Sequence, residues 1–175
     1  MEKEKVKEPE AEQLQEEHYD RNLRRIRELQ LKATTKKVVL RAKEIPWRQS
    51  RMGYVKRYLN WEVEDSALSG WTVFVHEIHR HSGKHCHQGG VSLFVIEGKG
   101  YTVVDGQRVD WEAGDLIILP IRPGGIVHQH FNADPGSPCR WIAWIHSPFG
   151  EAMGNLFRHE EDSPEFKKAG PAKEA

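Results

Sequence analysis

Two stretches of this sequence, HCHQGGVSLFVIEGKG at residues 85–100 and PGGIVHQHFN at residues 123–132, predict most of its fold and chemistry. The first places a His-x-His pair just before an apolar run. Because successive side chains of an extended strand point to opposite faces, His85 and His87 share one face and Cys86 takes the other. Two imidazoles on one face are arranged to share a metal ion.

The second stretch carries three polar residues of equal parity. His128, His130 and Asn132 alternate along the chain, so their side chains face the same way. A short barrel that lays this strand beside the first brings His128 to His85 and His87. Three histidines on one side of a metal leave positions open for water, substrate or oxygen. We therefore predict one divalent metal bound by His85, His87 and His128.

The sequence around these motifs reads as a series of short strands. Asp105-Gly106 between two β-type runs is a strong hairpin signal. Gly, Pro and Asp interrupt the runs at short intervals, a pattern typical of an all-β barrel or sandwich. The predicted strands cover residues 37–40, 71–79, 91–96, 101–104, 108–111, 116–119, 126–131 and 140–146.

The two ends differ from this middle part. Residues 1–17 are mostly charged, and residues 18–32 repeat apolar side chains at helical spacing, which predicts one amphipathic helix. We divide the chain into an arm and helix at 1–35, a barrel at 36–149 and a C-terminal extension at 150–175. The helix should cover the barrel or a partner subunit. Together with six tryptophans, it predicts a homodimer or higher homo-oligomer.

Composition excludes several classes of partner. Lys plus Arg equals Asp plus Glu at 26 each, so there is no excess of cations for nucleic acid. The mean hydropathy is −0.70, and no apolar run approaches the roughly 20 residues that span a bilayer. The start lacks the apolar segment of a signal peptide, so we expect a cytoplasmic protein. Two cysteines make neither a disulfide framework nor a four-cysteine zinc site.

The two histidine stretches resemble the sequence motifs of the cupin superfamily. The resemblance implies a small β-barrel of the cupin type, a double-stranded β-helix or jelly roll, with the metal on the three histidines. The first motif is matched by His85-Cys86-His87 and Gly98, and the second by Gly114, Pro120, Pro123, Gly125, His128 and Asn132, with a three-residue offset between the prolines.

One position departs from the cupin pattern. The motif glutamate falls at Val91 or Ser92, and counting back from Gly98 favours Val91. Three neutral imidazoles leave the +2 charge of the ion uncompensated, which favours an anionic, bidentate substrate. Val91, Leu93 and Val95 share parity and predict an apolar pocket floor that suits an aromatic or ketone substrate.

A closer resemblance is to the dioxygenases that cleave the rings of gentisate, salicylate and 1-hydroxy-2-naphthoate. It rests on EGKGYTVVDG at residues 97–106 and on His130, two residues past the third ligand. Those enzymes bind Fe(II) with three histidines and no glutamate. Two features differ: their substrate-gripping arginine aligns with Leu93, and they usually carry two cupin domains. The resemblance implies an Fe(II) dioxygenase that uses O2 to cleave a C–C bond of an aromatic or dicarbonyl compound chelating the metal.

The residues by themselves leave alternatives open. Imidazole also suits Mn, Ni and Zn, so the chain is alternatively a redox-neutral isomerase, lyase or hydrolase, or a non-enzymatic module that binds a small molecule. His130 is either an acid–base or substrate-orienting group or a hydrogen-bonded barrel histidine. Arg122 either pairs with an anionic substrate or lies at the surface.

Overall fold

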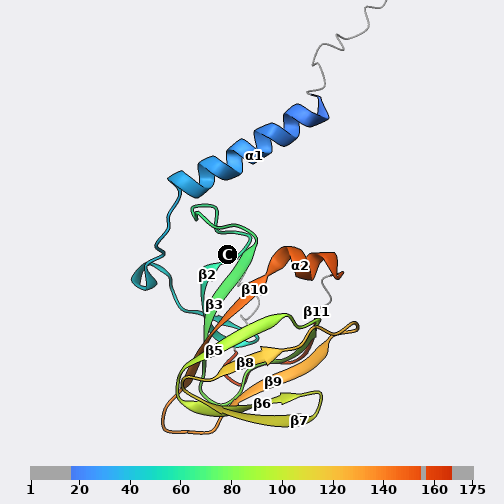
Figure 1. The fold of residues 1–175 in the computed structure, drawn as a ribbon. Coiled ribbons are helices and arrows are strands. Elements are labelled where there is room, and N and C mark those ends of the chain that lie inside the picture. Colours follow the sequence, from blue (N-terminus) through green and yellow to red (C-terminus); the bar gives the residue numbers. More distant parts are fainter. Residues whose placement is uncertain (1–16, 155–156, 167–175) are drawn as a thin grey trace, which may run out of the picture.

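A computed structural model describes residues 17–154 and 157–166 of the chain, and two antiparallel sheets form its body (Figure 1). The six-stranded sheet has the order β1 (Arg48–Ser50), β2 (Gly53–Leu59), β3 (Trp71–Ile78), β10 (Cys139–His146), β5 (Val91–Glu97) and β8 (Leu116–Leu119). The five-stranded sheet has the order β11 (Phe157–Glu161), β4 (Lys84–His87), β9 (Ile126–Asn132), β6 (Lys99–Val104) and β7 (Gln107–Glu112). The predicted all-β class is confirmed.

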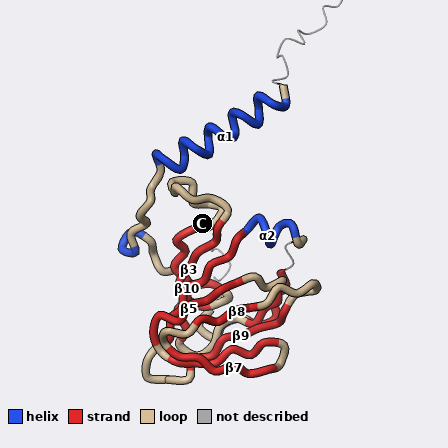
Figure 2. The backbone as a smooth tube through the Cα atoms, in the orientation of Figure 1, coloured by secondary structure: helices blue, strands red, loops and turns tan. Residues whose placement is uncertain are grey.

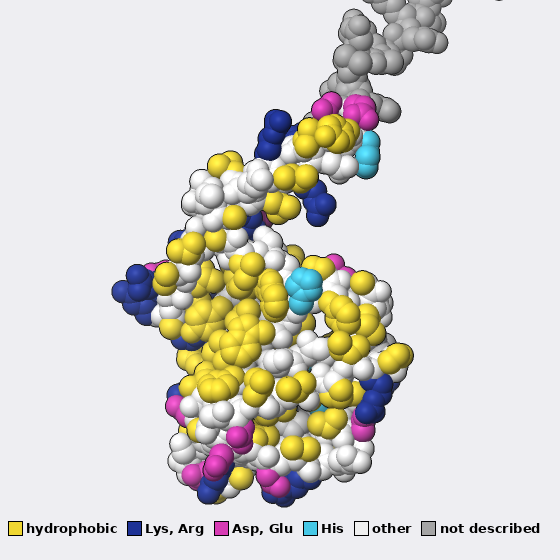
Figure 3. All heavy atoms as spheres, in the orientation of Figure 1, with side chains coloured by type: hydrophobic (Ala, Val, Ile, Leu, Met, Phe, Trp, Pro, Cys, Tyr) yellow, Lys and Arg dark blue, Asp and Glu magenta, His cyan; other side chains and the backbone are white. Residues whose placement is uncertain are grey.

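The core lies between the sheets and follows the alternation of the strands. On β5 the side chains of Val91, Leu93 and Val95 are buried, while the intervening Phe94 and Ile96 are exposed. Burying an aliphatic side chain of this size contributes roughly 1.5–3 kcal/mol. Figure 3 shows the exposed hydrophobic side chains spread over the barrel surface. The remaining buried members of the core cluster are Ile78, Trp111, Ile117, Leu119, Ile126, Cys139, Trp141 and Ala143.

The predicted hairpin joins β6 to β7. Its two central residues, Asp105 and Gly106, have φ of 47° and 83°. Positive φ at both positions is the signature of a type I′ turn, whose twist matches that of the flanking strands. The turn sets the β6–β7 register, in which Val104 pairs with Gln107.

The helices lie outside the barrel. Helix α1 (His18–Thr35) agrees with the predicted amphipathic helix, but it buries none of its residues. It extends away from the strands as a separate rod, so it does not cover the barrel of its own chain (Figure 2). The short helix α2 (Ser147–Ala152) follows β10, and a 3-10 turn, η1 (Ala42–Glu44), precedes β1. None of the helices in the described ranges is long and apolar enough to cross a bilayer.

The structure differs from the sequence-based expectation at both ends of the barrel. Residues 37–40 are not a strand, because no neighbouring strand pairs with them. Strands β1, β2 and β11 were not predicted. Strand β11 has the polar sequence FRHEE and pairs with β4 only at the sheet edge, so it has no apolar alternation to reveal it. Part of the predicted C-terminal extension therefore continues the five-stranded sheet.

Candidate metal centre

The antiparallel pairing of β4 with β9 brings three histidines together. His85 lies opposite His128 in the ladder, and His87 follows two residues later on the same face of β4. The ring centroids of His85 and His87 lie 4.2 and 4.6 Å from that of His128. One ring nitrogen from each of the three residues falls within 4.8 Å of the others. In the described ranges no other three His, Cys, Asp or Glu residues are grouped this way.

Burial keeps these imidazoles neutral. The pKa of His85 and that of His87 are both lowered to about 4; desolvation is the main cause for each, and repulsion from His87 contributes at His85. Desolvation also lowers the pKa of His128 to about 2, with added repulsion from the other two rings. A neutral imidazole has a free lone pair, which is the form that binds a metal. The buried Nδ1 of His85 has no hydrogen-bond partner among the described residues. The donor set therefore fits one divalent metal.

Backbone groups orient the other two rings. The Nδ1 atom of His128 is 3.3 Å from the carbonyl oxygen of Ile126, to which it donates in the tautomer that leaves Nε2 free. The Nδ1 atom of His87 accepts from the backbone N–H of Gly89 at 3.1 Å. If Nε2 of His87 binds the metal, the ring proton moves to Nδ1. Nδ1 can then no longer accept the hydrogen bond from Gly89, so metal binding would replace that bond.

His130 lies beside the three histidines on the same face of β9. Its ring centroid is 5.6 Å from that of His128, and the side chain is fully buried. The hydroxyl of Thr102 accepts from the indole N–H of Trp111 at 2.9 Å and lies 2.8 Å from Nδ1 of His130. If the hydroxyl donates a hydrogen bond to Nδ1, the proton of the neutral ring lies on Nε2. Desolvation, with repulsion from His128, holds the pKa of His130 well below its usual value.

The other predicted pocket residues lie in the core or at the surface. Val91, Leu93 and Val95 face the space between the sheets but are packed into the core cluster. Arg122 is exposed and forms an ion pair with Asp105, whose carboxylate also accepts from the backbone N–H of Val127. The ion pair with Asp105 offsets part of the charge that Arg122 could offer to an anionic substrate.

Aromatic and polar side chains from other strands also lie near this centre. His76 on β3 is buried. The ring centroid of Trp141 lies 4.7 Å from that of His76 and 5.0 Å from that of His130. Thr102 was not singled out, although it lies opposite His130 in the β6–β9 register. Only knowledge of that register identifies it, since its local sequence is an ordinary strand.

Residues 73–145 match the family model described as a Cupin domain. The barrel has the cupin fold. No match was found among curated proteins. Similar solved structures include Pac13 of Streptomyces, which is described as a nucleoside dehydratase. The two sequences are 17% identical, the TM-score is 0.52, and the match covers 73% of this chain and 93% of Pac13. An uncharacterised double-stranded β-helix protein of Klebsiella pneumoniae is 21% identical with a TM-score of 0.52. That match covers 73% of this chain and 100% of the Klebsiella protein.

A ring-cleaving enzyme is also among the similar structures. The salicylate 1,2-dioxygenase of Pseudaminobacter salicylatoxidans is 25% identical, covering 66% of this chain and 33% of its own. Its TM-score of 0.48 is too low to carry an argument about activity. The comparisons therefore support the cupin fold of the barrel.

Proposed function

We propose that this cupin is a metal-dependent enzyme that holds one divalent metal on His85, His87 and His128. The observation that carries the proposal is a cluster of three neutral, largely buried imidazoles, with no carboxylate of the described residues grouped among them. We further propose that the metal is Fe(II) and that the enzyme is a dioxygenase cleaving a C–C bond of an aromatic or dicarbonyl compound. When bound, Fe(II) would supply Lewis acidity and electrons for the reduction of O2.

The protein residues would select and orient the substrate. Three neutral ligands leave the charge of the ion uncompensated, so an anionic compound with two oxygen donors is favoured. Val91, Leu93 and Val95 form an apolar wall between the sheets that disfavours water. His130 would hold its proton on Nε2, fixed by Thr102 on the other side of the ring, and would donate a hydrogen bond from this N–H to a substrate oxygen.

A redox-neutral reaction is the second candidate, and the position of His130 favours it. A buried neutral histidine beside a Lewis-acidic Zn or Mn ion suits the proton transfers of an isomerase, lyase or hydrolase. A non-enzymatic cupin that only binds a small molecule would use the same three histidines.

Oxygen uptake separates these functions. Protein purified without added metal is analysed for metal content, reloaded with Fe(II), and mixed in an oxygen electrode with hydroxybenzoates and β-diketones. Oxygen consumption that requires both Fe(II) and His128 supports the dioxygenase. Metal-dependent turnover without oxygen consumption supports the redox-neutral enzyme. Binding of a compound without turnover supports the non-enzymatic cupin that only binds a small molecule.

We also propose that the chain forms a homodimer or higher homo-oligomer. Helix α1 buries nothing within its own chain, whereas most helices in proteins gain their stability by packing an amphipathic face against other elements. Exposed apolar side chains on the outer face of the six-stranded sheet add to the unpartnered surface; they include Phe94, Ile96, Leu116, Ile118 and Trp144. Light scattering that gives a monomer at micromolar concentration would contradict this.

A further inference from the structure

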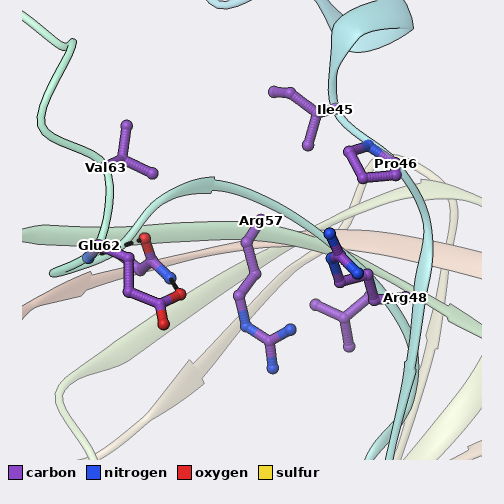
Figure 4. Close-up of a pocket in the computed structure, with 8 residues that line it drawn as sticks. Ile45, Pro46, Arg48, Arg57, Glu62 and Val63 are labelled. Carbon is purple, nitrogen blue, oxygen red and sulfur yellow. Dashed lines mark hydrogen bonds between the residues drawn. The ribbon is translucent and has the colours of Figure 1, made fainter.

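A cavity lies at the β1–β2 edge of the six-stranded sheet, and its lining contains none of the three histidines. Its volume is about 230 Å³. Strands β1 and β2 form its floor, while the segment before β1 and the loop after β2 form its sides (Figure 4). The cavity is too small for a drug-sized ligand, since such sites usually measure roughly 300–1,000 Å³.

Strand register places two arginines side by side on this floor. Arg48 lies directly opposite Val55 in the β1–β2 ladder, and Arg57 is two residues beyond Val55 on the same face. Such diagonal neighbours are roughly 7–8 Å apart, within reach of long side chains. In Figure 4 the guanidinium group of Arg57 extends into the space between Glu62 and Arg48. Two guanidinium groups can thus approach one anion.

These two arginines lack the partners that the other barrel arginines have. From residue 48 to the end of the described chain, Arg51, Arg80, Arg108, Arg122, Arg140 and Arg158 each form an ion pair with a carboxylate. Within the same described residues, Arg48 and Arg57 form none. Both line this one cavity, so the unpaired positive charge of the barrel arginines is concentrated there.

The single acid in the lining is already engaged. A carboxylate oxygen of Glu62 accepts a hydrogen bond from the side-chain amide of Asn60 at 3.0 Å, and the backbone N–H of Glu62 donates to the same side chain. With two arginines and one glutamate, the lining carries a formal net charge of +1. The cavity therefore favours an anion.

The walls are apolar. Ile45 and Pro46 form one side and Val63 the other (Figure 4). Val55, which lies opposite Arg48 in the ladder, also lines the cavity. An ion as strongly hydrated as free phosphate gains nothing from such walls. An organic anion would accept hydrogen bonds from the guanidinium groups with its charged end and pack its apolar part against these side chains.

We propose that this cavity binds a small organic anion, with a carboxylate or phosphate held by Arg48 and Arg57 and an apolar body packed against Ile45, Pro46 and Val63. This site is separate from the metal centre, and the proposal does not depend on the function proposed above.

The test uses the full-length protein and three probes of similar shape. Benzoate and phenyl phosphate carry the two anionic groups, and benzamide is the neutral counterpart of benzoate. Calorimetric titration should show binding of at least one anion and not of benzamide, weakening with added salt. Arg57→Gln and Arg48→Gln should each raise the dissociation constant about tenfold or more, and Arg57→Lys should weaken it less. Arg27→Gln, which removes the same charge from α1, should leave it unchanged.

The metal centre is excluded as the binding site by a separate variant. His87→Ala should retain anion binding, whereas an anion bound to the metal would lose it. Melting curves check that each variant is folded. Equal binding of benzoate and benzamide, unchanged affinity in folded Arg48→Gln and Arg57→Gln, or no anion binding at millimolar concentration would overturn the proposal.

Discussion

His85 and His128 lie directly opposite each other in the pairing of β4 with β9, and their ring centroids are 4.2 Å apart. The pair is held by strand hydrogen bonds, which fix its spacing more firmly than a loop would. Because His87 lies on the same face of β4, the ladder presents three donors to one point. Changes to these donors, to the strands beneath them and to the nearby buried histidine should therefore have separable effects.

Removing any one donor should weaken metal binding. We expect His85→Ala, His87→Ala and His128→Ala each to lower metal occupancy at least tenfold, because two imidazoles rarely retain a divalent ion. Elemental analysis of proteins purified in parallel measures this. His18→Ala, on exposed helix α1, is the control and should keep the full metal content. Unchanged stoichiometry in all three ligand variants would contradict the assignment.

The sequence motif favours Val91 over Ser92 as the position of the missing carboxylate, and we test that prediction at Val91. If its side chain points at the metal, Val91→Glu should maintain or raise metal affinity while oxygen-dependent turnover falls, because a carboxylate takes a position that substrate needs. Val95→Glu has the same parity on β5 but lies further along the core. It should cost several kcal/mol as an unpaired buried charge. If Val91→Glu also lowers the melting temperature without gaining metal, Val91 is a core residue and not the fourth position.

His76 should make the protein less stable in acid. Burial lowers its pKa to about 3, and repulsion from His85 and Arg57 acts in the same direction, against opposing effects of the Met52 backbone and Glu165. The unfolded chain takes up this proton near pH 6.5, so the folded state loses stability as the pH falls from 6.5 towards 3. The slope is on the order of 1.4 kcal/mol per pH unit.

Urea unfolding at pH 7.5 and 5.5 measures this dependence. His76→Gln should lose less stability on acidification than the unmodified protein, whereas His18→Gln should behave like it. An equal pH dependence in His76→Gln would show that other groups are responsible.

Gly125 allows β9 to approach β4. Its φ is +83°, and a Cβ there would lie 2.6 Å from Sγ of Cys86 and 3.0 Å from the carbonyl oxygen of His87. Gly124 has a φ of +82° but open space around it, which makes it a matched control. Both alanine substitutions incur the left-handed backbone strain of about 1–2 kcal/mol. Only Gly125→Ala should also displace β4 and lower metal occupancy; equal effects on metal content would contradict this.

The sequence by itself determined which faces of the strands are buried and which histidines act together. Alternation along His85–His87 and along His128–His130 is a local property, because the geometry of an extended chain fixes it wherever the strand lies. The Asp105-Gly106 turn is local for the same reason. Matches to the cupin motifs then supplied the expectation that the two strands are neighbours.

Tertiary structure decided everything that depends on pairing between distant segments. The register that sets Thr102 against His130 and Arg48 beside Arg57 arises from inter-strand hydrogen bonds, which leave no mark in the local pattern of either strand. Edge strand β11 is formed by polar residues whose only reason to be extended is the neighbouring β4. The same holds for the ion pair between Arg122 and Asp105, since pairing of charges across a fold follows from distance in space and not in sequence.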